Sequence, residues 1–307
     1  MNRKILCILL MGAMLLGALC GCKAQKMELE QISEQAFYER PLSQRKVTDE
    51  EGLTYYAEDA LKVVSYNIRY KDDKDGLSIK ERAPRLEKVL SKYDPDIIGA
   101  QEFTTRWEPQ LDRFTDTYDY ILTYRAPSDL ESAPIFWKAG KFELLDHGTF
   151  WLSETPDQQS IGWGADLHRI CTWAKFKVRA TGTVFYFLNT HFDFTDAPQE
   201  GSAKLLIEKV QSDFKDAPVI ITGDFNMEQD SKGYSIMSSY FTDVNMATVK
   251  DTKTGTYTGY GKESELIDYT FITKEGVKPL NYRVMTDLVE GKFVSDHYGI
   301  YSELILY

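Results

Sequence analysis

Polar side chains that bind metal ions or move protons follow several apolar runs in this sequence. The clearest case is 219–226, where four strand-forming residues lead through Gly223 to Asp224 and Asn226. A continuous apolar run bounded by proline and glycine predicts a buried strand. Asp224 and Asn226 would then lie just past its end, where open α/β sheets usually place their chemistry. Taken alone, the stretch is also compatible with an ordinary strand that ends in a polar turn.

The same pattern recurs along the chain. Further strand-end or strand-start residues of this kind are Asn67, Glu102, His191 with Asp193, and Asp296 with His297. Asp268 stands within an apolar stretch, where a carboxylate needs a partner. A structural role is the commoner one for any single residue of this kind. Coincidence across all of them is much less common, so we expect a shared site.

The residue types indicate the chemistry of that site. Carboxylate and amide oxygens without a Cys/His cluster suit Mg²⁺, with Mn²⁺ as the alternative, rather than structural zinc. Imidazole is the side chain best suited to proton transfer near neutral pH. Asp268 is a natural partner for His297, because a carboxylate fixes the tautomer of the ring and favours its charged form.

The elements that must position these residues form a mixed α/β pattern. A hydrophobic content of 43% and an aromatic content of 13% predict a substantial core. Helices are predicted at 79–93, at 107–114, from Ser202 onward and at 234–241. Strands are predicted at 61–66, 97–100, 118–123, 135–137, 142–145, 148–151, 170–178, 184–190, 219–222, 266–272 and 298–306. The alternation predicts one α/β sandwich domain at 60–307.

The net charge restricts the partners. The chain carries a formal charge of −11 and has no dense Lys/Arg cluster. Proteins that bind long nucleic acids usually have a basic face, so tight binding to such a polyanion is disfavoured. A phosphate-containing substrate remains compatible with this charge, because a bound cation reverses the local field.

The first 21 residues have the layout of a secretory signal. Arg3 and Lys4 precede an apolar run at 5–19, and Cys22 follows Gly21 as in a bacterial lipobox. We expect a signal peptide at 1–21, a lipidated Cys22, a tether at 22–59 and an extracytoplasmic protein anchored to the membrane. Ordinary secretion or an uncleaved anchor is the alternative. Cys171 is the only cysteine after Cys22 and is predicted to be a buried apolar residue.

Six short motifs occur in a recognisable order. They are Ser65-Tyr66-Asn67, Gln101-Glu102, Asn189-Thr190-His191, Gly223-Asp224-Phe225-Asn226, Ile267-Asp268-Tyr269 and Ser295-Asp296-His297. In this order the chain resembles the endonuclease/exonuclease/phosphatase superfamily, which is deoxyribonuclease I-like, from about residue 61 to 307. The resemblance implies a four-layer α/β sandwich of two mixed β-sheets flanked by helices. It also implies cleavage of phosphate esters with a divalent cation.

The resemblance further implies roles for individual residues. Glu102 is similar to the principal metal ligand, assisted by Asn67 and Asp296. Asp224 is similar to the group that orients or deprotonates the attacking water, with Asn226 beside it.

Two histidines complete this implied machinery. His297, held by Asp268, is similar to the histidine that contacts the phosphate. His191 is similar to a second histidine that contacts the phosphate or serves the leaving group.

Three further residues have two interpretations each. Glu131 is the expected carboxylate partner of His191, or else a surface glutamate. Arg169 meets a substrate phosphate, or else makes a structural salt bridge. Trp163, in a glycine-rich loop, is the best candidate for a stacking surface, although most tryptophans in this chain are expected in the core.

These residues predict a monomeric, metal-dependent phosphoesterase, either a phosphodiesterase or a phosphomonoesterase. An activated water would attack phosphorus in line, without a covalent enzyme intermediate. Nucleic acids, lipid head groups, inositol phosphates and sugar phosphates all remain open as substrates. The alternatives are a nuclease or deadenylase-like 3′-5′ exonuclease and a non-catalytic surface lipoprotein that binds its ligand on the same scaffold.

Overall fold

The computed structural model describes residues 46–48, 54–56 and 60–307. The chain separates into two units, 1–58 and 59–307. In the first unit, strands β1 (Lys46–Thr48) and β2 (Thr54–Tyr56) pair antiparallel. The predicted signal peptide, Cys22 and most of the predicted tether lie outside the described residues and stay predictions. Among the described residues, no helix combines the length and apolar character needed to cross a membrane.

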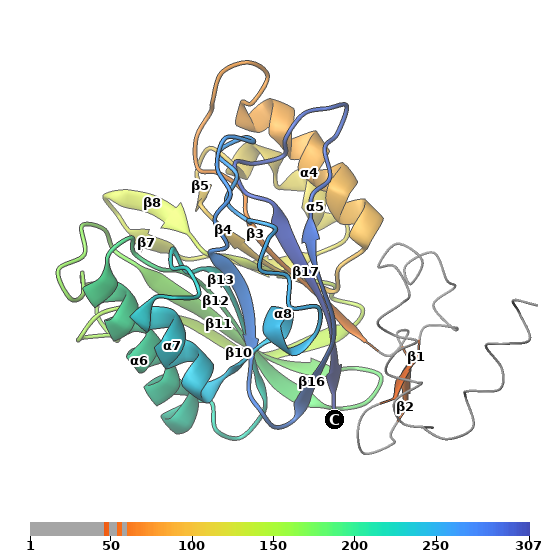
Figure 1. Cartoon of the computed structure of the whole chain (residues 1–307), viewed down its shortest axis with the longest axis vertical. Coiled ribbons are helices and arrows are strands. Elements are labelled where there is room, and N and C mark those ends of the chain that lie inside the picture. Colours follow the sequence, from red (N-terminus) through yellow and green to blue (C-terminus); the bar gives the residue numbers. More distant parts are fainter. Residues whose placement is uncertain (1–45, 49–53, 57–59) are drawn as a thin grey trace, which may run out of the picture. The chain divides into compact units, whose positions relative to one another are not determined.

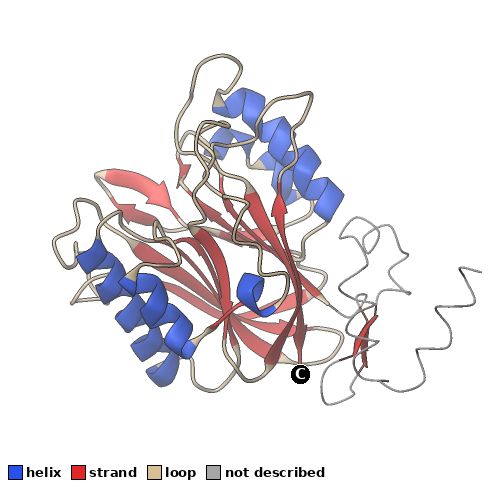
Figure 2. Cartoon of the chain, viewed as in Figure 1, coloured by secondary structure: helices blue, strands red, loops and turns tan. Residues whose placement is uncertain are grey.

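The second unit is built on two six-stranded mixed sheets (Figures 1 and 2). The first sheet has the order β10-β11-β12-β13-β15-β14, and the second has the order β16-β17-β3-β4-β9-β6. Only β12–β13 and β3–β4 are parallel pairs within these two sheets. A smaller three-stranded sheet has the order β5-β8-β7.

The strands of the second unit have the following bounds. The first sheet contains β10 (Phe142–Trp151), β11 (Ile170–Val178), β12 (Val184–His191), β13 (Val219–Asp224), β14 (Thr242–Asp243) and β15 (Asp268–Ile272). The second contains β3 (Leu61–Asn67), β4 (Ile97–Gln101), β6 (Asp119–Ile121), β9 (Ile135–Trp137), β16 (Val277–Met285) and β17 (Gly299–Leu306). The small sheet contains β5 (Phe103–Thr104), β7 (Tyr124–Ala126) and β8 (Asp129–Ser132).

Helices cover the outer faces of both large sheets. Helices α6 (Asp196–Ser212) and α7 (Lys232–Tyr240) pack on the first sheet, where Leu206 and Met237 join the same core cluster as Ile221. Helix α4 (Ile79–Tyr93), η3 (Glu108–Gln110) and α5 (Asp112–Thr115) accompany the second sheet. A short helix, α8 (Val244–Ala247), follows β14. The predicted four-layer α/β sandwich is confirmed.

Several predicted elements have different bounds in the structure. Helix α6 begins at Asp196 rather than near Ser202, because Thr195 is extended and Pro198 is accommodated in the first turn. The single helix expected at 107–114 is two short ones. The strands expected at 142–145 and 148–151 form one strand, β10, with an irregularity after Leu144. Strand β16 was not predicted, because Lys278, Pro279 and Asn281 interrupt its apolar pattern.

Polar side chains fasten the two sheets to each other near the ends of β4 and β12. Gly99 leaves room for this contact, because a Cβ there would overlap the side chains of Thr222 and Asn189. The Asn189 amide donates to the carbonyl oxygens of Ala100 (2.7 Å) and Pro134 (2.9 Å). Gln101 Nε2 donates to Asn189 Oδ1 at 2.7 Å. The sheets are therefore fixed by directional bonds as well as by apolar packing.

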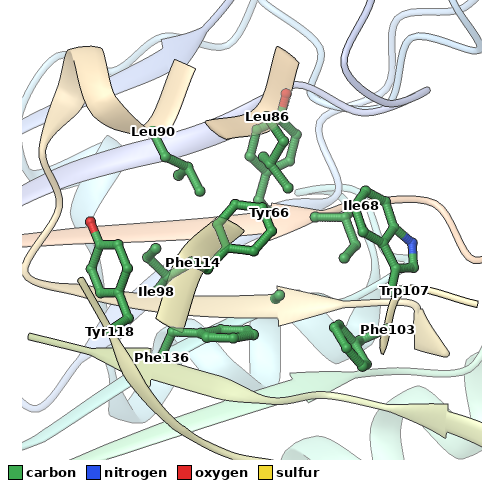
Figure 3. Close-up of a pocket in the computed structure, with 11 residues that line it drawn as sticks. Tyr66, Ile68, Leu86, Leu90, Ile98, Phe103, Trp107, Phe114, Tyr118 and Phe136 are labelled. Carbon is green, nitrogen blue, oxygen red and sulfur yellow. The ribbon is translucent and has the colours of Figure 1, made fainter. Parts of the chain in front are cut away.

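A small cavity lies between the second sheet and its helices (Figure 3). Its volume is about 20 Å³, and residues such as Tyr66, Ile98, Trp107 and Phe136 line it. No polar surface faces the cavity. A void of this size without polar partners does not hold an ordered water. It is a packing gap of the core and not a ligand site.

Arg82 on α4 is fully buried and holds a loop beside the strand ends. Its Nε donates to the carbonyl oxygen of Leu77 at 2.8 Å, and Nη2 donates to those of Arg69 (3.1 Å) and Lys71 (2.7 Å). Its Nη1 donates to Ile68 and, at 3.4 Å, to Val294. Because both Arg69 and Val294 lie within two residues of predicted site residues, Arg82 links helix α4 to two segments of that site.

We predict that Arg82→Met destabilises the protein by at least about 2 kcal/mol, because several backbone carbonyl oxygens would lose a charged donor. Chemical denaturation followed by circular dichroism measures the change. Lys88→Met, at an exposed position of the same helix, is the matched control and is expected to have little effect. Equal stabilities of the two variants would contradict the role given to Arg82.

Candidate active site

The predicted site residues converge at one edge of the sandwich. Asn67, His191 and Asp224 end β3, β12 and β13, and Glu102 follows β4. Asp268 begins β15, while Asp296 and His297 precede β17. This edge therefore contains the carboxyl ends of the parallel strands. It also contains the amino ends of their antiparallel neighbours. Glu102 and Asn226 have positive φ angles, of 60° and 49°, which turn the chain sharply out of the strands.

Asp224 is the centre of the arrangement. The side chain is almost completely buried, at 1% exposure. Its Oδ2 accepts a hydrogen bond from Asn67 Nδ2 at 2.9 Å. The Nε2 atoms of His191 and His297 each lie 3.6 Å from this same oxygen. Burial raises the pKa of Asp224, but the two histidines outweigh burial and the net shift is downward, so the carboxylate is ionised.

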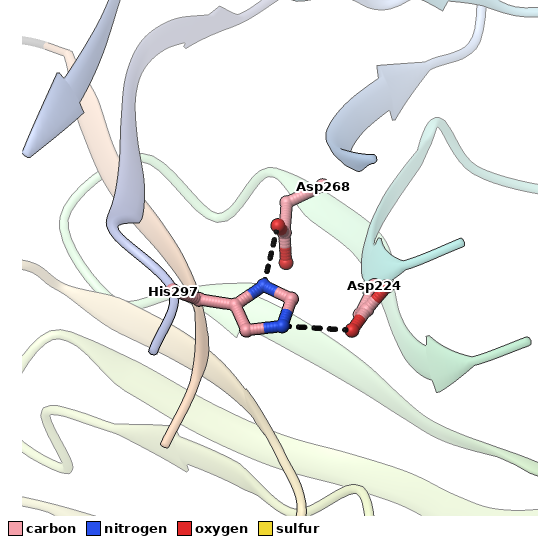
Figure 4. Close-up of side chains that lie close together, drawn as sticks. All are labelled: Asp224, Asp268 and His297. Atoms are coloured by element: carbon pink, nitrogen blue, oxygen red, sulfur yellow. Dashed lines mark hydrogen bonds and ion pairs between the residues drawn. The ribbon is translucent and has the colours of Figure 1, made fainter. Parts of the chain in front are cut away.

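His297 lies between two carboxylates (Figure 4). Its Nδ1 is 2.9 Å from Asp268 Oδ2, and Asp268 is 1% exposed. Burial would lower the pKa of His297, but the charges of Asp268 and Asp224 outweigh it and raise the pKa to about 10. Without a metal ion nearby, His297 is therefore an imidazolium at neutral pH, held in orientation by Asp268.

His191 has a carboxylate partner of its own. Its Nδ1 lies 3.2 Å from Glu131 Oε1, on β8 of the small sheet. Arg125 Nη1 donates to the same oxygen at 2.7 Å. The side chain of Glu131 is only 13% exposed, so the structure places it as a buried partner rather than as a surface glutamate. The Nε2 of His191 is buried and has no hydrogen-bond partner among the described residues.

Asn67 connects Glu102 to Asp224 by hydrogen bonds. Asn67 Nδ2 donates to Glu102 Oε1 at 3.0 Å as well as to Asp224. The backbone amide of Tyr70 donates to Glu102 Oε2 at 2.7 Å. The oxygens of the two carboxylates fit a hard divalent cation. The Asn67 amide turns its nitrogen toward them, and its Oδ1 accepts from the backbone amide of Arg69 at 3.0 Å. Glu102 and Asp224 could therefore hold such an ion, and Asn67 would join them only with its amide turned over.

Asp296, also predicted as a metal ligand, is paired with a residue that the sequence analysis missed. Arg69 Nη1 lies 2.9 Å from Asp296 Oδ2, and Arg69 Nε donates to Asp73 at 3.1 Å. Asp296 would thus serve a metal ion only in competition with Arg69. Its position two residues after Asn67 was the one feature of the sequence that could have indicated a role for Arg69 in the site.

Asp224, Asp268 and His297 also have ligand atoms within 4.8 Å of one another. We interpret this cluster as a set of carboxylates that orient a charged imidazole and not as a metal site. Because His297 is an imidazolium, neither of its ring nitrogens has a lone pair for an ion, and its Nε2 remains a hydrogen-bond donor.

The remaining predicted residues have mixed outcomes. Asn226 Nδ2 donates to the carbonyl oxygen of Phe192 at 3.0 Å, so it fastens the neighbouring loop. Arg169 is 3% exposed and faces Asp193 (3.5 Å) and Glu131 (3.9 Å).

The prediction of Trp163 as a stacking surface is wrong, because its ring covers Gly201 on α6 and packs against the core. Cys171 is buried, as expected.

Comparison with known proteins agrees with this geometry. The model of the Endonuclease/Exonuclease/phosphatase family matches residues 64–297, and the chain belongs to this family. It is a hydrolase that acts on phosphate esters.

Individual solved structures are similar over most of the chain. An endonuclease/exonuclease/phosphatase family protein from Bacteroides thetaiotaomicron is 31% identical, with a TM-score of 0.74 over 81% of this chain and 98% of that one. A mannosyl-6-phosphatase from the same species is 31% identical, with a TM-score of 0.73 over 80% of this chain and 100% of that one. TDP2 from D. rerio, complexed with a single-strand DNA product, is 18% identical, with a TM-score of 0.63 over 80% and 98% of the two chains, and shares the fold.

We predict that Glu131 acts through His191. Glu131→Gln should lower kcat/KM about tenfold or more, and His191→Ala about 10²–10⁴-fold, the usual range for a positioned acid or base. The double variant should be no slower than His191→Ala, because two residues that act as a unit are not additive. Steady-state kinetics on p-nitrophenyl phosphate measure all three; fully additive losses would show that Glu131 acts independently.

Proposed function

We propose that the protein is a divalent-metal-dependent phosphoesterase that hydrolyses its substrate by in-line attack of an activated water. The convergence of two histidines on one oxygen of Asp224 carries this proposal. Each Nε2 is 3.6 Å from that oxygen, which is too long for a hydrogen bond and leaves both ring nitrogens available to a substrate. A phosphate oxygen or a water at this point would meet two donors and one acceptor.

The residues divide the chemistry between them. Ionised Asp224 accepts a proton from the attacking water. The carboxylate also orients the lone pair of the water oxygen toward phosphorus. His297, charged and held by Asp268, donates to a phosphate oxygen and stabilises the negative charge that develops there. His191, steadied by Glu131, delivers a proton to the departing alkoxide. A divalent cation held by Glu102 and Asp224 would neutralise phosphate charge when bound.

A small phosphorylated molecule is the substrate class we favour. The similar mannosyl-6-phosphatase supports it, and the net charge of −11 disfavours a long polyanion. A 3′-5′ exonuclease is the second candidate, supported by the TDP2 complex with single-strand DNA, whose likeness to this chain is one of fold. A purely binding lipoprotein is disfavoured, because binding alone does not need two histidines with buried carboxylate partners.

We also propose an extracytoplasmic, membrane-anchored location. The proposal rests on the basic start, the apolar run at 5–19 and Cys22 after Gly21. Substrates would then be encountered outside the cytoplasm, and the catalytic unit would act as a monomer held at the membrane by lipidated Cys22.

The proposed chemistry predicts the behaviour of two variants. Glu102→Gln should lower kcat about 10²-fold or more and weaken Mg²⁺ binding, because a ligand charge is lost. His297→Ala should lower kcat by a comparable factor while leaving Mg²⁺ affinity nearly unchanged. The measurements are turnover of p-nitrophenyl and bis-p-nitrophenyl phosphate with Mg²⁺, Mn²⁺ or EDTA, and calorimetric titration with Mg²⁺. Wild-type turnover that is insensitive to EDTA would contradict metal dependence. Undiminished turnover in both variants would contradict the proposed phosphoesterase function.

The proposed location predicts that Cys22→Ser moves the protein from the membrane fraction to the soluble fraction, because a serine cannot receive the lipid. Cell fractionation with immunoblotting measures the distribution, and metabolic labelling with a radioactive fatty acid reports lipidation directly. Cys171→Ser is the control and should leave the distribution unchanged, since this thiol is buried in the core. Retention of the Cys22→Ser variant in the membrane would refute the anchor.

A further inference from the structure

A cleft of about 640 Å³ opens beside the catalytic edge. Glu102, Glu131 and His191 are among the residues that line it. A volume of this size is that of a typical small-molecule site. Because His191 would serve the leaving group, the part of the cleft around it is where the alcohol portion of a phosphate ester would lie.

Apolar side chains gather around this cleft. Tyr70, Leu130, Leu167 and Phe194 all line it, with exposures of 39%, 43%, 36% and 66%. These four come from separate segments of the chain, and Phe194 has the largest exposure among the large apolar side chains of the described residues. Exposed apolar groups that converge on one cleft are a mark of a ligand surface, whereas singly scattered ones need no explanation.

Arg169 supports the most exposed of these residues. Its guanidinium carbon lies 5.1 Å from the centre of the Phe194 ring, within the range of a cation–π contact. Nε of this buried arginine is paired with Asp193 at 3.5 Å, whereas Nη2 has no hydrogen-bond partner among the described residues. Buried donors are normally satisfied, so an unsatisfied one on a residue that lines a cleft indicates that a ligand oxygen completes it.

The charges of the cleft restrict its occupant. Four acidic residues line it, Asp72, Glu102, Asp129 and Glu131, and so do four basic ones, Lys71, Arg106, Arg125 and Arg169. Arg125 is paired with Asp129 and Glu131, and Arg106 lies 3.7 Å from Asp72. The cleft thus has no excess of positive charge for a second phosphate. Its chemistry suits a neutral group with an apolar face.

We infer that Phe194, Leu130 and Leu167 form the leaving-group subsite, and that it takes a neutral ring with one apolar face and oxygen atoms at its edge. This inference rests on the proposed phosphoesterase function. A sugar ring and a nucleoside both have this chemistry, and the ring stacks on Phe194 while an edge oxygen accepts from Arg169. The subsite selects ring-bearing phosphate esters over ringless ones.

Kinetics of Phe194→Ala test the subsite. The substrates are mannose 6-phosphate, adenosine 5′-monophosphate and glycerol 1-phosphate, which has no ring. We expect kcat/KM for at least one ring-bearing ester to fall about tenfold in the variant, mainly through KM, because stacking binds ground state and transition state alike. Turnover of glycerol 1-phosphate should not change. Which ring ester the wild type prefers identifies a sugar or a nucleoside as the source.

Leu145→Ala, at an exposed apolar position on β10 that does not line the cleft, is the control and should leave all three substrates unaffected. Calorimetric titration of the same esters in EDTA gives a readout that does not need turnover, and there too Phe194→Ala should weaken a ring ester about tenfold. Equal effects on ring-bearing and ringless esters, or no effect on either, would overturn the subsite. Absence of wild-type turnover on every ester would overturn the proposed function instead. In that case the titration still tests the subsite. The subsite is refuted when no ring-bearing ester binds more tightly than glycerol 1-phosphate.

Discussion

The buried charge of Asp224 is the constraint on which the rest of the site depends. An isolated carboxylate at this depth would cost several kcal/mol, so it persists only with partners. The partners come from both sheets: Asn67 ends a strand of the second sheet, while His191 ends the neighbouring strand of the first. The two layers must therefore close on each other for the carboxylate to remain ionised. The site is therefore complete only in the assembled sandwich.

Each further acid at the edge has a different partner. Asp268 faces His297, Asp296 faces Arg69, and Glu131 faces Arg125 and His191. Between Asp224 and His297 the attraction lowers the pKa of the carboxyl and raises that of the imidazole, so that an acceptor and a donor of protons stand side by side at one pH. A carboxylate that orients water and an imidazolium that contacts phosphate can thus coexist 3.6 Å apart.

The sequence was sufficient to predict the sandwich and most of the residues at its active edge. Strand ends such as Asn67 and Asp224 have a local signal, an apolar run followed by a polar residue. Arg82 and Phe194 lack one, because their roles depend on contacts with other segments of the chain, such as Val294 for Arg82 and Arg169 for Phe194. Trp163 failed for the same reason: nothing local indicates that its ring covers Gly201. Strand β16 was missed since an edge strand tolerates proline and polar residues that a central strand does not.

The bonds between Asn189, Gln101 and the backbone around Ala100 have a consequence for how the protein meets its substrate. They join the two sheets directly beneath the ends of β4 and β12, so the halves that carry Glu102 and His191 cannot slide past each other. The catalytic dipoles are therefore aligned when the chain folds, and no reorientation energy is needed at the moment of reaction. Adaptation to different substrates is left to the surrounding loops, which can change in length and sequence without disturbing the aligned groups.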